Sequence, residues 1–473
     1  MGGPSPGGRR KFLSTVAGGQ HPAADSWFNV VTVAGAFMQR LAIVIGCLAT
    51  AAGTCAFAAD MAVKAPPVAA SPAAVASWEG FYVGGDIGYG IGISKLNVPG
   101  AFDSNFFGSH GVSGGVLGGY NHMLAPRWLL GIEADANWSS IDHSEVFNDG
   151  FGDVANIAIT EKHSYSVRGR LGYLLAPNTL LYGTGGWSWA QFVYSLTSTV
   201  GAAGTATLRL GGPQLGFGVE TQLGRGWNAR LEYLEAFYGD SSFNSSVFGT
   251  NLHLQPAVGV GRLALIYRFG ADKDPAWAAP APTPSWNGPT IAATVAAVTA
   301  TAKVDSAQAP GNDIDGFGSS AILPTALVGY NWRIAPRWVF GIDGGAAPGI
   351  ATTQIHIDGT EAAHARLGYL LTPATMIYAS TGWFQSGFNT AQLFANKALA
   401  PHQRANALEI GAGVETALDG HWAVRFEYQY GFIQTIDNVV ITVQTVTGPT
   451  QLPIALHPQV QSAQAGLVYR FNN

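Results

Sequence analysis

The sequence predicts an all-β fold, an antiparallel β-barrel that spans a membrane, and three observations lead to this prediction. Only 11% of the 473 residues are charged, well below the usual share in soluble domains, while glycine (62 residues) and aromatic residues (11%) are abundant. No long, strongly apolar run follows the first 60 positions, which argues against membrane-spanning helices. Several segments instead alternate apolar and polar residues, as barrel strands do between lipid and a polar interior.

The segment 168–187 shows this alternation most clearly, and it occurs twice. Arg168 and Arg170 fall on one face of the predicted strand, and Leu171 and Tyr173 fall on the other. A turn that contains proline then leads into a second strand, so the segment is predicted to form a β-hairpin. We expect a tandem duplication, because these pairs of segments match: 169–187 with 365–383, 119–133 with 329–343, 218–221 with 413–416, 230–233 with 425–428, and 265–269 with 467–471.

Two stretches rich in alanine and proline divide the chain, and each is followed by a Trp-x-Gly sequence, at Trp78 and at Trp286. Such stretches are extended and semi-rigid, as expected of linkers. The predicted segments are a superfluous N-terminal extension at 1–37, a signal peptide at 38–58, a periplasmic leader at 59–77, a first barrel at 78–270, a Pro/Ala-rich linker at 271–285 and a second barrel at 286–473.

Residues 38–58 have the three parts of a secretion signal: a basic residue, an apolar core and an Ala-x-Ala sequence. Cleavage is predicted between Ala58 and Ala59. Both cysteines of the chain, Cys47 and Cys55, lie inside this segment. The mature chain is therefore expected to contain no disulfide, thiol chemistry or cysteine-based metal site.

Each copy is predicted to contain eight strands whose connections alternate between two or three residues and about twenty polar residues. Short turns at one end, long loops at the other and an even strand count are typical of outer-membrane barrels. The strands of the first copy are expected near 80–92, 113–124, 127–138, 163–175, 179–194, 212–223, 227–238 and 257–269.

Charged residues of the polar parity are expected to face the barrel interior and to form ion pairs there. The interior of an eight-stranded barrel is just wide enough for side chains to fill, and an unpaired buried charge would be costly. Acids and bases are equal in number in the first copy, which favours a closed, ion-paired plug over an open pore. The candidates are Glu133, Asp135, Arg168, Arg170, Glu220, Arg230, Glu232 and Arg262 in the first copy and Asp343, Arg366, Glu409, Glu415, Arg425 and Glu427 in the second.

The alternation leaves one place undecided. Trp187 and Trp189 fall on the opposite face from Tyr182. Either the strand contains a bulge or aromatic residues lie inside the barrel.

No catalytic, cofactor or metal site is expected. Glu133 with Asp135, or Glu220 with Glu232, would suit an acid pair of a hydrolase, but their strand parity and the matching arginines favour structural ion pairs. The histidines of the first copy lack ligand spacing. We therefore expect a protein that is not an enzyme and that has no cofactor, and the net charge of −5 gives no reason to expect a nucleic-acid partner.

The aromatic and glycine-rich sequence at 78–85, the Arg-Gly-Arg-Leu-Gly-Tyr sequence at 168–173 and the Tyr-Arg-Phe sequence at 267–269 together carry a resemblance. Residues 38–270 resemble the alphaproteobacterial outer-membrane immunogenic protein family, which are small porin-like or opacity-like surface barrels. The resemblance implies Sec export to the cell outer membrane, contact with its lipid, and periplasmic chaperones and the barrel-assembly machinery as partners during biogenesis. It also implies exposed antigenic loops that are open to host or matrix contact.

We therefore expect a surface barrel with a structural and antigenic role and at most small-solute permeability. The alternative is one sixteen-stranded barrel, a porin for small hydrophilic solutes, since wider barrels leave an aqueous channel. Against it, the fifteen-residue linker is much longer than the other turns at that end. Strand 80–92 would pair with 257–269 in two separate barrels and with 457–471 in a single one.

Overall fold

The computed structural model describes most of the chain after residue 77. The predicted extension, the signal peptide with Ala58 and Ala59, the leader and most of the linker lie outside the described residues. Among the residues described, no helix has the length and apolar character needed to cross a bilayer. The described ranges are 78–98, 102–148, 154–199, 203–245, 250–271, 285–305, 313–351, 356–389, 402–445 and 448–471.

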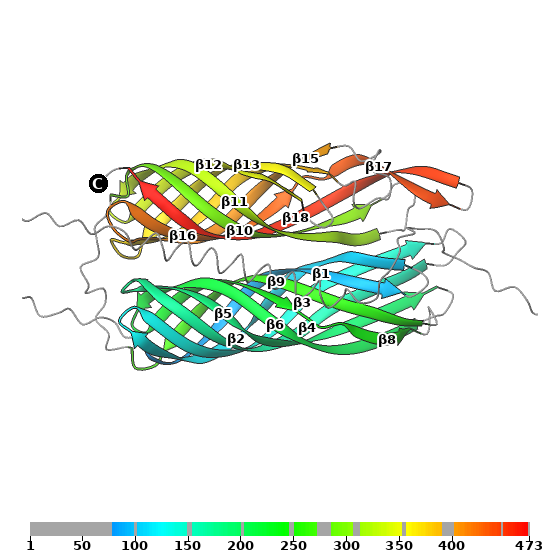
Figure 1. Cartoon of the computed structure of the whole chain (residues 1–473), viewed down its shortest axis with the longest axis horizontal. Coiled ribbons are helices and arrows are strands. Elements are labelled where there is room, and N and C mark those ends of the chain that lie inside the picture. Colours follow the sequence, from blue (N-terminus) through cyan, green and yellow to red (C-terminus); the bar gives the residue numbers. More distant parts are fainter. Residues whose placement is uncertain are drawn as a thin grey trace, which may run out of the picture. The chain divides into compact units, whose positions relative to one another are not determined.

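The first copy closes into a ring of eight long antiparallel strands (Figure 1). Each strand pairs with the next, and β9 returns to pair with β1 from Tyr82 to Asn97. The short β8 extends the sheet beside the end of β9. The strands are β1 (Gly80–Val98), β2 (Phe102–Ala125), β3 (Trp128–Asn148), β4 (Val154–Ala176), β5 (Thr179–Ser198), β6 (Ala203–Gly224), β7 (Trp227–Phe237), β8 (Ser241–Ser245) and β9 (Thr250–Arg268).

The second copy closes in the same way. Its last strand, β18, pairs with β10 from Thr290 to Asp305, and β17 extends the sheet beside β18. The strands are β10 (Gly288–Asp305), β11 (Asp313–Ala335), β12 (Trp338–Ala351), β13 (His356–Leu370), β14 (Thr375–Asn389), β15 (His402–Ala417), β16 (Trp422–Ile433), β17 (Ile436–Thr445) and β18 (Gly448–Arg470).

The strand pairing decides between the two predicted architectures. A sixteen-stranded ring requires β1 to pair with β18, but β1 pairs with β9 and β18 pairs with β10. The prediction of two tandem eight-stranded barrels is confirmed, and the sixteen-stranded alternative is wrong.

The membrane-facing belt is clearest on β3. Trp128 and Trp138 lie ten positions apart, which matches the ~9–11 residues that a barrel strand needs to cross a bilayer. Leu130 and Ile132, between them, are 47% and 59% exposed. Aromatic residues at both ends of an apolar belt are typical of outer-membrane barrels.

The strands are much longer than predicted, because residues expected to form loops continue the sheet. The predicted strands at 80–92 and 113–124 extend as β1 and β2, which stay paired up to Val98 and Phe102. Beyond the belt the polarity of the two faces reverses, since the residues there that point inward are apolar. Among these buried residues are Ile141, Ile157, Ile159, Phe192, Tyr194, Leu196, Leu208, Leu210 and Leu254.

Of the two explanations for the aromatic residues of β5, the structure supports an aromatic residue inside the barrel, since β5 pairs with β6 without a bulge. Trp187 and Trp189 point outward and are 46% and 49% exposed. Tyr182 is the aromatic residue that lies inside, where its hydroxyl donates to Glu232 at 2.8 Å.

Candidate functional site

The interior of the first barrel contains a layer of arginines and carboxylates at the level of the membrane belt. Arg168 Nη2 lies 2.7 Å from Glu133 Oε1 and 2.6 Å from Asp135 Oδ2. Arg230 bridges the layer, since its two terminal nitrogens lie 2.6 Å from Glu133 and 2.9 Å from Glu220. These side chains are almost fully buried.

The remaining arginines of the layer complete the network. Arg170 lies 3.0 Å from Glu220, and Arg262 lies 2.8 Å from Glu232 and 3.2 Å from Asp135. Because these four carboxylates (Glu133, Asp135, Glu220 and Glu232) each face an arginine at hydrogen-bonding distance, their charges are compensated inside the barrel.

Sequence reasoning missed several members of this layer. Asp86 on β1 lies 3.8 Å from Arg262. It was not predicted to face the interior, because the glycines around it hide the alternation of apolar and polar residues. Tyr82 donates to Glu133 at 2.8 Å, and its ring crosses Gly119, where a side chain would clash. The glycine at the position paired with Tyr82 on β2 was the signal in the sequence that this tyrosine points inward.

The lumen of the first barrel is also filled below the charged layer. Trp78 is 1% exposed and packs with Leu129, Leu174 and Leu180. Its indole nitrogen donates to the carbonyl of Pro177 in a short turn, at 2.9 Å. Short turns lie on the periplasmic side of such barrels, so this tryptophan closes the periplasmic mouth.

The second barrel has a related but smaller charged layer. Asp343 lies 2.9 Å from Arg366 and 3.1 Å from Arg425. Glu415 lies 3.2 Å from Arg366, 3.1 Å from Arg425 and 2.8 Å from Arg470. At the periplasmic mouth, Trp286 repeats the position of Trp78, and its indole donates to the carbonyl of Pro373 at 2.8 Å.

The other two carboxylates of the second layer, Glu427 and Glu409, contact hydroxyl groups or a histidine in place of arginines. Glu427 accepts hydrogen bonds from Tyr378 at 3.1 Å and from Ser380 at 2.6 Å. His364, which the sequence analysis did not select, has its two ring nitrogens 3.1 Å from Asp343 and 2.8 Å from Glu409.

Five aligned positions differ in charge between the two layers. At four of them the first-copy residue is charged and its counterpart is neutral or a histidine, and at the fifth the second copy gains a carboxylate, Glu409 for Gln214. Thr294 donates to Gln464 at 2.9 Å, much as Asp86 faces Arg262 in the first barrel. The counterparts are Thr294 for Asp86, Gly345 for Asp135, His364 for Arg168 and Gln464 for Arg262.

Neither layer has the geometry of a reactive site. Apart from Asp86, which only faces Arg262 at 3.8 Å, the carboxylates of both layers form hydrogen bonds or ion pairs with neighbouring side chains. Trp78 and Trp286 separate them from the periplasmic side. In the part of the chain that the structure describes, no group of three or more acidic, histidine or cysteine side chains could hold a metal ion. The arrangement is suited to filling and stabilising a barrel.

Comparisons with known proteins agree with this architecture. Residues 61–255 match the outer membrane protein beta-barrel domain, and residues 352–473 match the OmpA-like transmembrane domain. The 31 kDa outer-membrane immunogenic protein of Brucella melitensis is 30% identical over 245 residues, which cover 48% of this chain and 99% of that protein. The 22 kDa outer membrane protein of Rhizobium leguminosarum is 34% identical over 116 residues, 23% of this chain and 43% of that protein.

Solved structures give only distant alignments. A FadL homologue of Pseudomonas aeruginosa aligns with 85% of this chain and 93% of its own, at 11% identity and a TM-score of 0.30. Ail, the attachment invasion locus protein of Yersinia pestis, aligns with 40% of this chain and 99% of its own, at 15% identity and a TM-score of 0.22. Alignments with scores this low add nothing on function.

The sequence match to the Brucella protein spans nearly that whole protein, and both copies fold as antiparallel barrels with a lipid-facing belt. The chain thus belongs to the outer-membrane immunogenic protein family of β-barrels and is located in the cell outer membrane.

Proposed function

We propose that this protein is a closed surface barrel with a structural and antigenic role and at most small-solute permeability. The observation that carries the proposal is the filling of the first lumen at three successive levels. Trp78 occupies the periplasmic mouth, the Arg168 and Arg230 network crosses the belt, and an apolar cluster follows above it. A solute would have to displace buried, hydrogen-bonded ion pairs, which are costly to break.

The paired strand ends beyond the belt support the antigenic part of the proposal. Buried apolar side chains pack between these strand ends, and this packing should hold them as rigid projections at the end opposite the short turns. Such projections offer host or matrix molecules a fixed surface. The Brucella relative is named as an immunogenic protein.

The same proposal includes the biogenesis of the chain. Sec export with cleavage between Ala58 and Ala59, escort by periplasmic chaperones and insertion by the barrel-assembly machinery suit an outer-membrane barrel. The segment 271–285 would then join the two barrels on the periplasmic side, because β9 ends and β10 begins at the ends that carry the short turns. An enzymatic role is not proposed, because the buried carboxylates are engaged in structural contacts.

Conductance in planar bilayers tests the closed lumen. The full mature chain should give small or absent conductance, since both periplasmic mouths are occupied by tryptophan. Large, stable conductance steps would contradict the proposal and favour a pore.

Epitope insertion at the two ends of β7 tests the exposed surface. A tag between Gly239 and Asp240 should bind antibody on intact cells, whereas a tag at Arg225, in the short turn before β7, should bind only after the outer membrane is opened. Equal access at both positions, or the reverse order, would overturn the proposed orientation.

A further inference from the structure

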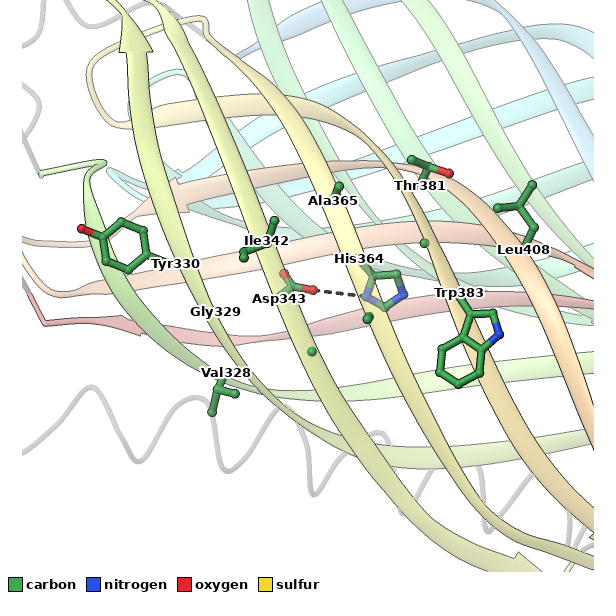
Figure 2. A pocket seen from close by; sticks show the side chains of 13 residues that line it. Val328, Gly329, Tyr330, Ile342, Asp343, His364, Ala365, Thr381, Trp383 and Leu408 are labelled. Carbon is green, nitrogen blue, oxygen red and sulfur yellow. Dashed lines mark hydrogen bonds and ion pairs between the residues drawn. The ribbon is translucent and has the colours of Figure 1, made fainter.

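The outer face of the second barrel carries an apolar groove of about 840 Å³ that runs across β11 to β15 (Figure 2). Val328 and Ile342 form one wall, and Trp383 and Leu408 form the other. These four side chains are 44–65% exposed. They point away from the barrel interior, so the groove opens toward the surrounding membrane.

The floor of the groove is formed by small residues. Gly344, Ala363 and Ala365 have the same outward parity as Ile342, and the backbone is therefore only thinly covered here. The charged neighbours Asp343 and His364 turn inward and face each other at 3.1 Å (Figure 2). The groove thus presents carbon atoms and no charge.

The first barrel has a different outer surface at the aligned positions. Its floor carries a larger side chain that is 46% exposed, Val167, and two of its four wall residues are smaller. The counterparts are Val167 for Ala363, Gly118 for Val328 and Pro213 for Leu408. The groove is therefore a property of the second copy's sequence and not of the shared fold.

The two arginines beside the periplasmic turn of the same hairpin point to different sides. Arg333 lies opposite Val339, which is buried in the lumen, and its guanidinium donates to the carbonyl of Pro336. Arg337 is exposed and donates to the hydroxyl of Tyr369 at 3.2 Å. Tyr369 shares the outward parity of Ala365, so this guanidinium lies on the lipid side of the rim. Five residues separate Arg337 from Ile342, which corresponds to roughly 16 Å of strand.

We propose that this groove binds one acyl chain of a phospholipid from the periplasmic leaflet, whose phosphate is bound by Arg337. The groove begins beyond Trp338 on the same strand and extends to Trp383, at the depth of the hydrocarbon. Arginine is the side chain best suited to phosphate. A cation at the headgroup level and an apolar groove above it together match a phospholipid. The site is independent of the closed or open state of the barrels.

Native mass spectrometry of the full chain tests the proposal. The protein is folded into vesicles of phosphatidylethanolamine and phosphatidylglycerol, extracted with detergent and examined for retained phospholipid. Wild-type protein should retain a single phospholipid. Ala363→Phe fills the groove from the outer face and should abolish retention, and Arg337→Gln should lower it about tenfold.

Val167→Phe is the matched control, because it makes the same change at the aligned position of the first barrel. It should retain phospholipid as the wild type does. All variants must show the mobility difference between boiled and unboiled samples that folded barrels give on detergent gels. Failure of the wild type to retain lipid, equal retention by Ala363→Phe, equal loss in Val167→Phe, or no effect of Arg337→Gln would each overturn the proposal.

Discussion

The two barrels share strand order, ring closure and the tryptophan at the periplasmic mouth, but their interiors differ in charge. The first layer combines Asp86, Asp135, Arg168 and Arg262, and the second has a threonine, a glycine, a histidine and a glutamine at these positions. Two acids and two arginines are replaced together, and the histidine faces Glu409, which stands where the first copy has Gln214. The comparison shows that an eight-stranded ring tolerates a less charged interior when partners are lost in pairs, as the cost of an unpaired buried charge requires.

The largest expected effect comes from the arginine that both layers keep. Arg230→Met leaves Glu133 and Glu220 without their shared partner, and Arg425→Met does the same to Asp343 and Glu415. Each change should lower the free energy of unfolding of its own barrel by about 3–5 kcal/mol. Urea titration in vesicles measures the change. Arg225→Met, in an exposed turn, is the control, and a similar small effect for all three would refute the shared role.

Removing the tryptophan at the periplasmic mouth should affect conductance differently in the two barrels. Trp78→Ala and Trp286→Ala each remove a buried side chain at the mouth, which should cost about 3 kcal/mol of stability. Trp286→Ala should raise planar-bilayer conductance more than Trp78→Ala, because the second interior has the smaller charged layer. A larger increase in conductance for Trp78→Ala would contradict the view that the second interior is less tightly filled by its charged layer.

A smaller effect should follow from giving the first barrel a residue of the second. Arg262→Gln retains a hydrogen-bonding amide but removes the charge that faces Glu232 and Asp135, and it should cost about 2 kcal/mol. Adding Asp135→Asn removes the surplus carboxylate and should restore part of the loss. The double variant, measured by the same urea titration, would refute pairwise compensation if its loss equalled the sum of the two single losses.

The barrel class and the inward direction of Arg168 and Arg170 could be predicted from the sequence, because they depend on local alternation of apolar and polar residues. The duplication could be predicted from the matching segments of the two copies. The partners of each charge depend on register between strands far apart in sequence, as with Asp86 on β1 and Arg262 on β9. Local patterns do not encode that register, so Asp86 was missed.

The length of the strands was underestimated for a different reason. Beyond the belt the inward face becomes apolar, as at Ile157 and Phe192, while the outward face becomes polar. A segment with this reversed pattern has the polar composition of a loop and the alternation of a strand. Composition alone therefore predicted a loop where the ring continues.

Disulfide cross-linking between strands tests the central claim, that each copy closes on itself. Ile87 on β1 lies opposite Leu263 on β9, and both side chains are exposed on the outer face. The aligned position on β18 is Ala465, opposite Val295. The pair Ile87→Cys and Leu263→Cys should form a disulfide in the folded mature chain, whereas Ile87→Cys with Ala465→Cys should not. A cross-link between positions 87 and 465 in place of the first would show that the two copies share one ring and would contradict the account.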